Sequence, residues 1–346
     1  MNIFDTATLV QTVPNLIVAQ NWLLDRFFTN VVTYDSAEVA IDVEVGARRI
    51  APFCSPLVQG KIVESKRYQT NTFKPAYIKD KRVPDLRKPI KRQFGERIGG
   101  ELSMEEREMY NIQSEMADQI DMINRRLEWM AAQALQTGQI TVQGEGFETT
   151  VVDFGRSSDL TVALSGANKW PVTVTAGNTK PTNDLEAWAT LVLQKSGVVV
   201  RDVVFTAKSW KAFLCDERVI KSGIEMPALS PYNNAVNPGT EVSTGAIYKG
   251  RWGQFDLWLY NDWFIDPADD TEKPMVVDGN VLLSGPQLQG TRAFGAIIDP
   301  AFAYNAMAYA PKTWLNEDPA QRFLLMQSAP LIIPSRVNAS FCATVV

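Results

Sequence analysis

The residue types that carry most acid–base and metal chemistry are absent or widely spaced in this chain. It contains no histidine and only three cysteines, Cys54, Cys215 and Cys342. Because imidazole is the usual general base and a common zinc ligand near neutral pH, its absence excludes Ser-His-Asp and Cys-His catalysis. Three distant cysteines provide neither C-x-x-C metal spacing nor a paired disulfide framework. We expect reduced, mostly buried thiols, no metal site and no cofactor.

Carboxylates are the remaining candidates for catalysis. Asp184 with Glu186, and Asp269 with Asp270, are close pairs in a chain with nine Trp residues, and paired carboxylates serve glycoside hydrolysis. A structural interpretation is favoured over this one. The first pair falls in the first turn of an expected helix, where acids complement the dipole, and the second falls in an acidic surface loop at 266–272. A carbohydrate-active enzyme stays as the alternative function.

Composition narrows the class of protein further. The chain has 346 residues, 45% of them hydrophobic, and 34 basic against 39 acidic residues give a net charge of −5. A dedicated nucleic-acid binder is usually basic, so this balance argues against one. The hydrophobic content and length suffice for a sizeable core, in two domains or one elaborate domain. No apolar run of 18 residues and no secretory pattern is present, which predicts a soluble protein of the synthesising cell's cytoplasm.

The most regular pattern predicts a long helix over 104–137. Ser103 and Glu106 form a capping box, and Gly138 is a natural C-terminal stop. Apolar residues recur every three or four positions between them and form one stripe: Met109, Ile112, Met116, Ile120, Ile123, Leu127, Met130 and Ala134. At about 1.5 Å per residue the helix is about 50 Å long. Strand-like sequence at 139–154 could cover the stripe; a self-pairing coiled-coil adaptor is the other interpretation.

A basic stretch precedes this helix. Residues 61–97 hold twelve cations and four acids, a net charge of +8 that leaves −13 for the rest of the chain. Three prolines exclude one long helix, while β-branched and aromatic residues favour extended structure. Two isolated strands have no core between them, so we expect a long loop that lies on a neighbour. A solvated basic loop is the simpler alternative.

The other segments predict a divided chain. An apolar run at 22–28 indicates a helix, either an arm that docks elsewhere or part of the local core. Alternation at 37–45 predicts a half-buried strand. A loop-rich stretch at 157–183 precedes an α/β block at 184–308, with its first helix beginning near Asp184, and C-terminal strands follow it. We therefore expect the two ends of the chain to form one domain and the middle another.

Several segments, in this order along nearly the whole chain, resemble the major capsid protein of lambda-type tailed phages. They are Ser55-Pro56-Leu57-Val58, Gly60-Lys61-Ile62-Val63, Phe73-Lys74-Pro75-Ala76-Tyr77-Ile78-Lys79, Gly144-Glu145-Gly146-Phe147, Asp153-Phe154-Gly155-Arg156, Tyr248-Lys249-Gly250, Pro311-Lys312-Thr313-Trp314, Asp318-Pro319-Ala320 and Met326-Gln327-Ser328-Ala329-Pro330-Leu331. The sequences of the expected loops near 223–246 and 266–274 depart from those of the family.

The resemblance implies an α+β fold of the Hong Kong 97 capsid type. Residues 1–35 would be an N-terminal arm and 46–95 an extended loop. Residues 100–180 with 310–346 would form a peripheral domain, whose spine helix is 104–137. Residues 184–308 would form an axial domain at the centre of each capsomer.

The implied function is self-assembly, with no enzymatic activity. Hexamers and pentamers would close into an icosahedral shell around double-stranded DNA bound without sequence specificity, in the host cytoplasm and then the virion head. Expected partners are a separate scaffolding protein, a portal and a decoration protein, and no membrane is involved. Head maturation would tilt the spine helix and the loop. The expected inter-subunit residues are Lys61, Lys66, Arg67, Phe73, Lys74, Tyr77, Lys79, Lys81 and Arg82.

The polar face of the expected spine helix is acidic. This face contains seven acidic residues, including Glu128, and three arginines. Our hypothesis is that part of this face lines the interior of the shell and repels packaged DNA.

Overall fold

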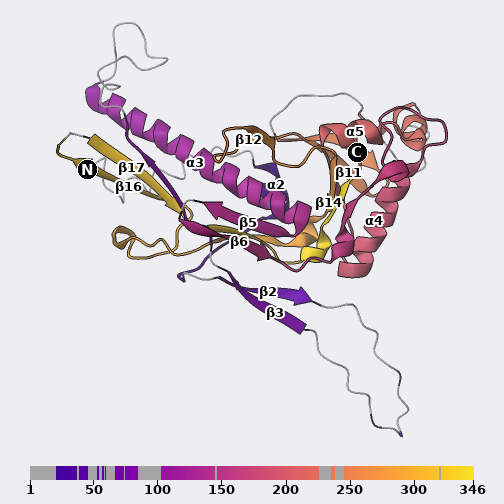
Figure 1. Ribbon diagram of the computed structural model, residues 1–346, viewed down its shortest axis with the longest axis horizontal. Helices are drawn as coiled ribbons and strands as arrows, with labels where there is room; N and C mark the ends of the chain where they lie inside the picture. The colour runs from indigo at the N-terminus through magenta and orange to yellow at the C-terminus, as the bar shows by residue number, and fades with distance from the viewer. Residues whose placement is uncertain are drawn as a thin grey trace.

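The computed structural model describes residues 21–36, 39–45, 53, 57, 59, 67–73, 75–84, 103–144, 146–225, 235–237, 245–318 and 321–346. Helices and strands are mixed along the chain in an α+β arrangement. Figure 1 shows helix α3 lying diagonally across the middle of the molecule, a lobe with α4 and α5 at one end, and the ribbon β2–β3 projecting below the body.

Helix α3 (Met104–Thr137) has the limits that its sequence predicts. The Ser103 hydroxyl accepts the backbone N–H of Glu106, and the Glu106 carboxylate accepts the backbone N–H of Ser103, so the capping box is confirmed. At the other end Gly138 adopts a left-handed conformation with φ of 73° and closes the last turn. Both ends of α3 are therefore set by residues at or next to those ends.

The apolar stripe of α3 is covered by segments of the same chain. It contacts strands β17 (Gln321–Ser328), β18 (Pro330–Pro334) and β19 (Phe341–Thr344), strand β5 (Gln139–Gly144) and the short helix α2 (Trp22–Phe27). Leu324, Met326, Leu331 and Ile332 pack into the same core. A coiled-coil adaptor would need this stripe for self-pairing, and the strands already occupy it.

A seven-stranded sheet forms the core of the second lobe. Its order is β7 (Thr161–Ala163), β19, β14 (Asn280–Ser284), β8 (Asp202–Phe205), β11 (Phe255–Tyr260), β10 (Ala246–Trp252) and β9 (Ala235–Val236). Helices α4 (Lys180–Ser196) and α5 (Ala207–Phe213) pack on it through Trp188 and Trp210. The sheet crosses the limits expected for the 184–308 block, because β7 and β19 pair with each other and β19 pairs with β14.

Smaller sheets complete the architecture. Strand β1 (Asn30–Thr33) pairs with β15 (Gly290–Phe294) and β15 with β18, while β16 (Ala310–Asn316), β17 and β4 (Ile78–Arg82) form another three-stranded sheet. Three two-stranded ribbons are β2 (Val39–Val45) with β3 (Arg67–Phe73), β5 with β6 (Phe147–Asp153), and β12 (Trp263–Ile265) with β13 (Glu272–Pro274). Short helical turns are η2 (Ser158–Leu160), η3 (Gly166–Asn168), the π-helix η4 (Val219–Glu225), η6 (Pro286–Leu288), η7 (Pro300–Phe302) and η8 (Val337–Ala339).

The structure decides between the two interpretations of residues 22–28 and moves the starts of two expected elements. The run at 22–28 joins the local core, since Leu23, Leu24, Phe27 and Phe28 are each at most 2% exposed. The ribbon β2–β3 begins at Val39, before the expected start of the loop at 46. Helix α4 begins at Lys180, four residues earlier than expected, because Pro181 suits a first helical turn. No helix of the described segments is long and apolar enough to cross a membrane.

The C-terminal stop of α3 can be tested with a matched pair of glycines. An alanine at φ of 73° costs about 1–2 kcal/mol, and at Gly138 its Cβ would also lie 2.6 Å from the Cβ of Arg156. We expect Gly138→Ala to lower the free energy of unfolding by about 3 kcal/mol, measured by urea denaturation. Gly155→Ala has the same φ but no atom within 4 Å, so it should show only the smaller backbone cost. Equal losses in the two variants would contradict the role of the Arg156 contact.

Candidate functional site

The strand β4 docks on α3 and forms the most elaborate polar site in the expected inter-subunit region. It pairs antiparallel with β17, from Ile78 opposite Ser328 to Arg82 opposite Leu324. Alternate side chains of a strand point to opposite faces. Asp80 and Arg82 therefore face α3, and Lys79 and Lys81 face away from it and are exposed.

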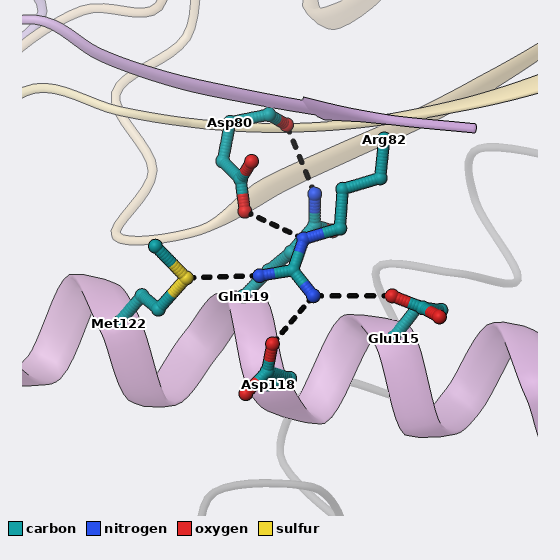
Figure 2. A network of polar contacts seen from close by, with 6 residues as sticks. All are labelled: Asp80, Arg82, Glu115, Asp118, Gln119 and Met122. Atoms are coloured by element: carbon teal, nitrogen blue, oxygen red, sulfur yellow. Dashed lines mark hydrogen bonds and ion pairs between the residues drawn. The ribbon is translucent and has the colours of Figure 1, made fainter. Parts of the chain in front are cut away.

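The guanidinium of Arg82 collects carboxylates from both elements (Figure 2). Its Nε lies 3.0 Å from Asp80 Oδ2, and its Nη1 lies 3.1 Å from Glu115 Oε2 and also contacts Asp118. Its Nη2 lies 2.9 Å from the sulfur of Met122. Glu115, Asp118 and Met122 share one face of α3 because they are spaced three and four residues apart. Burial alone lowers the pKa of Arg82, but the hydrogen bonds to Asp118 and Glu115 outweigh it and raise the pKa.

A backbone contact reinforces this docking. The Gln119 amide donates to the carbonyl oxygen of Asp80 at 2.9 Å (Figure 2). Gln119 is buried, and a buried amide that loses its partner is costly. The strand is thus attached to α3 through both its side chains and its backbone.

A second polar network holds the start of β4. The Tyr77 hydroxyl donates to Gln327 Oε1 at 2.8 Å and accepts the backbone N–H of Ile298 at 3.1 Å. Gln327 in turn donates to Asp299, which pairs with Lys312 at 2.8 Å. The hydrogen bond from Lys312 lowers the pKa of Asp299, so this carboxylate stays ionised at neutral pH.

The outward face of β4 carries cations over aromatic rings. Lys81 Nζ lies 4.2 Å from the ring centre of Phe323 and 5.4 Å from that of Trp314, and these two rings stack at 5.3 Å. Lys79 Nζ lies 5.2 Å from the ring centre of Tyr77. Exposed cation–aromatic contacts contribute about 0.5–1 kcal/mol each. Both ammonium groups thus stay at the surface in defined positions.

Part of this segment, which we expect to contact a neighbouring subunit, also binds its own chain. Tyr77 and Arg82 bind groups of the same chain, and Phe73 packs edge-on against Phe154 at 6.0 Å. The sequence cannot show that β17 offers a free edge to β4. Arg67 lies in β3, while Lys61, Lys66 and Lys74 lie outside the described residues.

The expected core of α3 is inside the molecule. Ile112, Met116, Ile120, Ile123, Leu127 and Met130 are each at most 4% exposed, and Met109 is half-buried.

Several acids of the expected acidic face of α3 form ion pairs with arginines of the same chain. Glu115 and Asp118 pair with Arg82, Glu108 pairs with Arg322, and Asp121 pairs with Arg125. Part of the negative charge of this face is therefore paired within the chain, and repulsion of packaged DNA by the remaining acids stays a prediction.

Glu128 does not lie on the exposed polar face of α3, where its sequence position predicts it. It is 1% exposed. Its carboxylate accepts the backbone N–H groups of Leu23 and Leu24 at 2.9 and 3.0 Å and the hydroxyl of Tyr260 at 3.0 Å. Burial raises the pKa of Glu128 to about 7, against the lowering effect of these hydrogen bonds. The alanines at 131, 132 and 134 were the available signal that this half of α3 is enclosed on more than one side.

One carboxylate of each pair considered for catalysis has structural partners. Asp184 accepts the indole N–H of Trp170 at 2.8 Å. Hydrogen bonds from Lys273 and Thr271 lower the pKa of Asp269 to about 2, so it cannot act as an acid near neutral pH. Cys215 and Cys342 are buried free thiols, and burial raises the pKa of Cys342 to about 12. Within the described ranges no three acidic or cysteine side chains are grouped to hold a metal ion.

Comparison with known proteins gives one consistent match. A family model described as phage major capsid protein E matches residues 5–345. The major capsid proteins of Escherichia phage lambda and Escherichia phage N15 are each 28% identical over 338 residues, 96% of this chain and 96% of each relative. Among solved structures, a protein described as a capsid protein of an Escherichia coli CFT073 prophage has a TM-score of 0.73 at 20% identity, covering 99% of both chains. A phage-related protein of Bordetella bronchiseptica has a TM-score of 0.52 at 12% identity, covering 97% of this chain and 95% of that one.

The Arg82 network yields a stability prediction. Arg82→Met leaves the carboxylates of Asp80 and Glu115, whose side chains are 23% and 22% exposed, close together without their cation. We expect a loss of about 1–3 kcal/mol in unfolding free energy, measured by urea denaturation. Arg125→Met on α3 is the control: Arg125 and its partner Asp121 are about half exposed, and its bond to the carbonyl oxygen of Trp263 is also exposed, so it should cost less than about 0.5 kcal/mol. An Arg82 variant as stable as the Arg125 variant would show that the network adds nothing.

Proposed function

This chain belongs to the phage major capsid protein E family, and from that premise we propose how its copies build a shell. The protein is a structural, non-enzymatic component of the virion head, with a Hong Kong 97 type capsid fold, and it associates with further copies of itself. We infer that these copies form the hexamers and pentamers of an icosahedral shell around double-stranded DNA. The observation that carries the proposal is the match over residues 5–345.

The domain limits that the family resemblance implies are part of this proposal. Residues 1–35 are assigned to the arm, 46–95 to the extended loop, 100–180 with 310–346 to the peripheral domain and 184–308 to the axial domain. Support for the loop comes from β2–β3, a ribbon of seven residue pairs that projects from the body (Figure 1). An isolated two-stranded ribbon is marginally stable, so a neighbouring copy is the natural place for it to gain contacts.

The two polar networks give the loop a fixed root. Tyr77 and Arg82 attach β4 to its own body, so the direction in which the ribbon leaves the subunit is defined. We infer that Tyr77, Arg82 and Phe73 orient the loop, and that the outward-facing Lys79 and Lys81 contact an acidic surface of the adjacent copy. Each exposed ion pair contributes about 0–1 kcal/mol, so the shell depends on many repeated contacts.

Other partners belong to the same proposal. A separate scaffolding protein, a portal and a decoration protein would assist assembly in the host cytoplasm. Packaged DNA would be enclosed without sequence-specific contacts, since the net charge of −5 provides no general attraction to phosphates. The carbohydrate-active enzyme has no support, because a structural family accounts for the chain.

Reversing the outward charges of β4 tests the inter-subunit contact. We expect the double variant Lys79→Glu with Lys81→Glu to fold, with a melting temperature lowered only by the loss of its exposed cation–aromatic contacts, and yet to form few closed shells, seen by negative-stain electron microscopy. The acidic side chains would meet an acidic neighbour, and like charges in an interface disfavour association. The variant with Lys79→Arg and Lys81→Arg keeps the charge and should assemble normally. Normal shells from the glutamate variant would contradict the contact.

A further inference from the structure

Glu128 supplies a helix cap that α2 lacks in its own sequence. The first N–H groups of a helix have no partner within it, and the N-cap residue Asn21 makes no side-chain bond to them. Glu128 on α3 accepts the N–H groups of Leu23 and Leu24 instead, one on each carboxylate oxygen. One carboxylate thus attaches the start of α2 to the C-terminal half of α3.

The junction is apolar around this carboxylate. Leu23, Leu24, Phe27 and Phe28 are buried beside it, and the ring of Trp22 lies 6.2 Å from that of Tyr260. Three elements, α2, α3 and β11, meet there. Removing an ionised carboxylate from water into such surroundings is costly unless a cation or enough donors compensate.

The charged groups nearby do not supply a cation to Glu128. On α2, Asp25 pairs with Arg292 at 2.6 Å and Arg26 pairs with Asp202 at 2.7 Å. On α3, Arg125 pairs with Asp121. The groups that face Glu128 from β11 and the turn after it are the Tyr260 hydroxyl and Asp262, whose negative charge disfavours a second one. Among the described residues no salt bridge reaches Glu128.

We propose that Glu128 is a proton-binding site that couples the docking of α2 on α3 to pH, because the docked junction takes up a proton that the opened segment releases. This inference goes beyond the proposed function and does not depend on it. A protonated carboxyl still fits the geometry. Its oxygens keep lone pairs for the N–H groups of Leu23 and Leu24, and the Tyr260 hydroxyl can reverse its role and accept the new O–H.

The direction of the coupling follows from the two states. In the docked state the pKa of Glu128 is raised by burial to about 7, from the ordinary value of 4.5 that the opened, solvated segment regains. Between these values the docked state binds more protons than the open one, so opening becomes easier as the pH rises. The change levels off above about pH 7. Mild acid therefore tightens the contact between α2 and α3.

Hydrogen exchange of the full-length chain tests this coupling directly. The measured quantity is the protection factor of a peptide covering residues 21–28, corrected for the intrinsic pH dependence of exchange. We expect the opening equilibrium of this segment to rise about thirty-fold between pH 5.5 and pH 8.5. Protection that stays constant over this range would overturn the proposal.

Variants separate proton binding from general stability. Glu128→Gln cannot titrate, so its opening should be flat with pH even though its absolute protection falls through loss of one acceptor. Glu105→Gln, an exposed acid on the same helix, should keep the slope of the unaltered chain. Tyr260→Phe removes a donor that lowers the pKa of Glu128 and should move the transition to higher pH. If Glu128→Gln keeps the pH dependence of opening of the unaltered chain, another group causes the effect and the proposal is wrong.

Discussion

The structure depends on the need to cover one apolar stripe along the whole length of a 34-residue helix. Such a helix cannot bury its own stripe, and a single sheet of short strands does not extend along it. The chain therefore brings segments from both ends to α3: the N-terminal helix α2 at one point, β17 and β18 at others, and the hairpin β5–β6 next to its C-terminus. The order of these segments in the sequence matters less than the surface that each one covers.

This constraint explains why the polar groups of α3 behave differently along its length. Toward the N-terminus the helix is partly open to solvent, and its acids are compensated by cations such as Arg82, Arg322 and Arg125. Toward the C-terminus the helix is enclosed, and polar groups there are satisfied by backbone. Glu128 accepts N–H groups of α2, and Arg156 donates to the carbonyl oxygens of Leu135 and Gln136 at the helix end.

The features that the sequence predicts are those whose interacting residues lie close together along the chain. Ser103, Glu106 and Gly138 act within a few residues of themselves, so the limits of α3 are readable from local chemistry. Glu128 binds groups 104, 105 and 132 residues away, and the nearby alanines at 131, 132 and 134 indicate that this half of α3 is enclosed without identifying those partners. The positions of Tyr77 and Arg82 depend likewise on which strand accepts β4 at its edge, which composition and periodicity do not encode. The fold type was predictable chiefly because many scattered segments resemble one family in the same order.

The root of the loop illustrates how a shell protein can be both rigid and able to reach a neighbour. If β4 were free, the ribbon β2–β3 would sample many directions, and binding to a neighbour would have to offset that lost freedom. Attachment through Tyr77, Arg82 and the backbone of Asp80 fixes β4 within the subunit itself and so reduces this cost. Under the proposed function, the alternation of β4 separates two tasks on one strand: the inward side chains orient the loop, and the outward lysines contact the adjacent copy. In that proposal the strand contributes to assembly by direction as well as by charge.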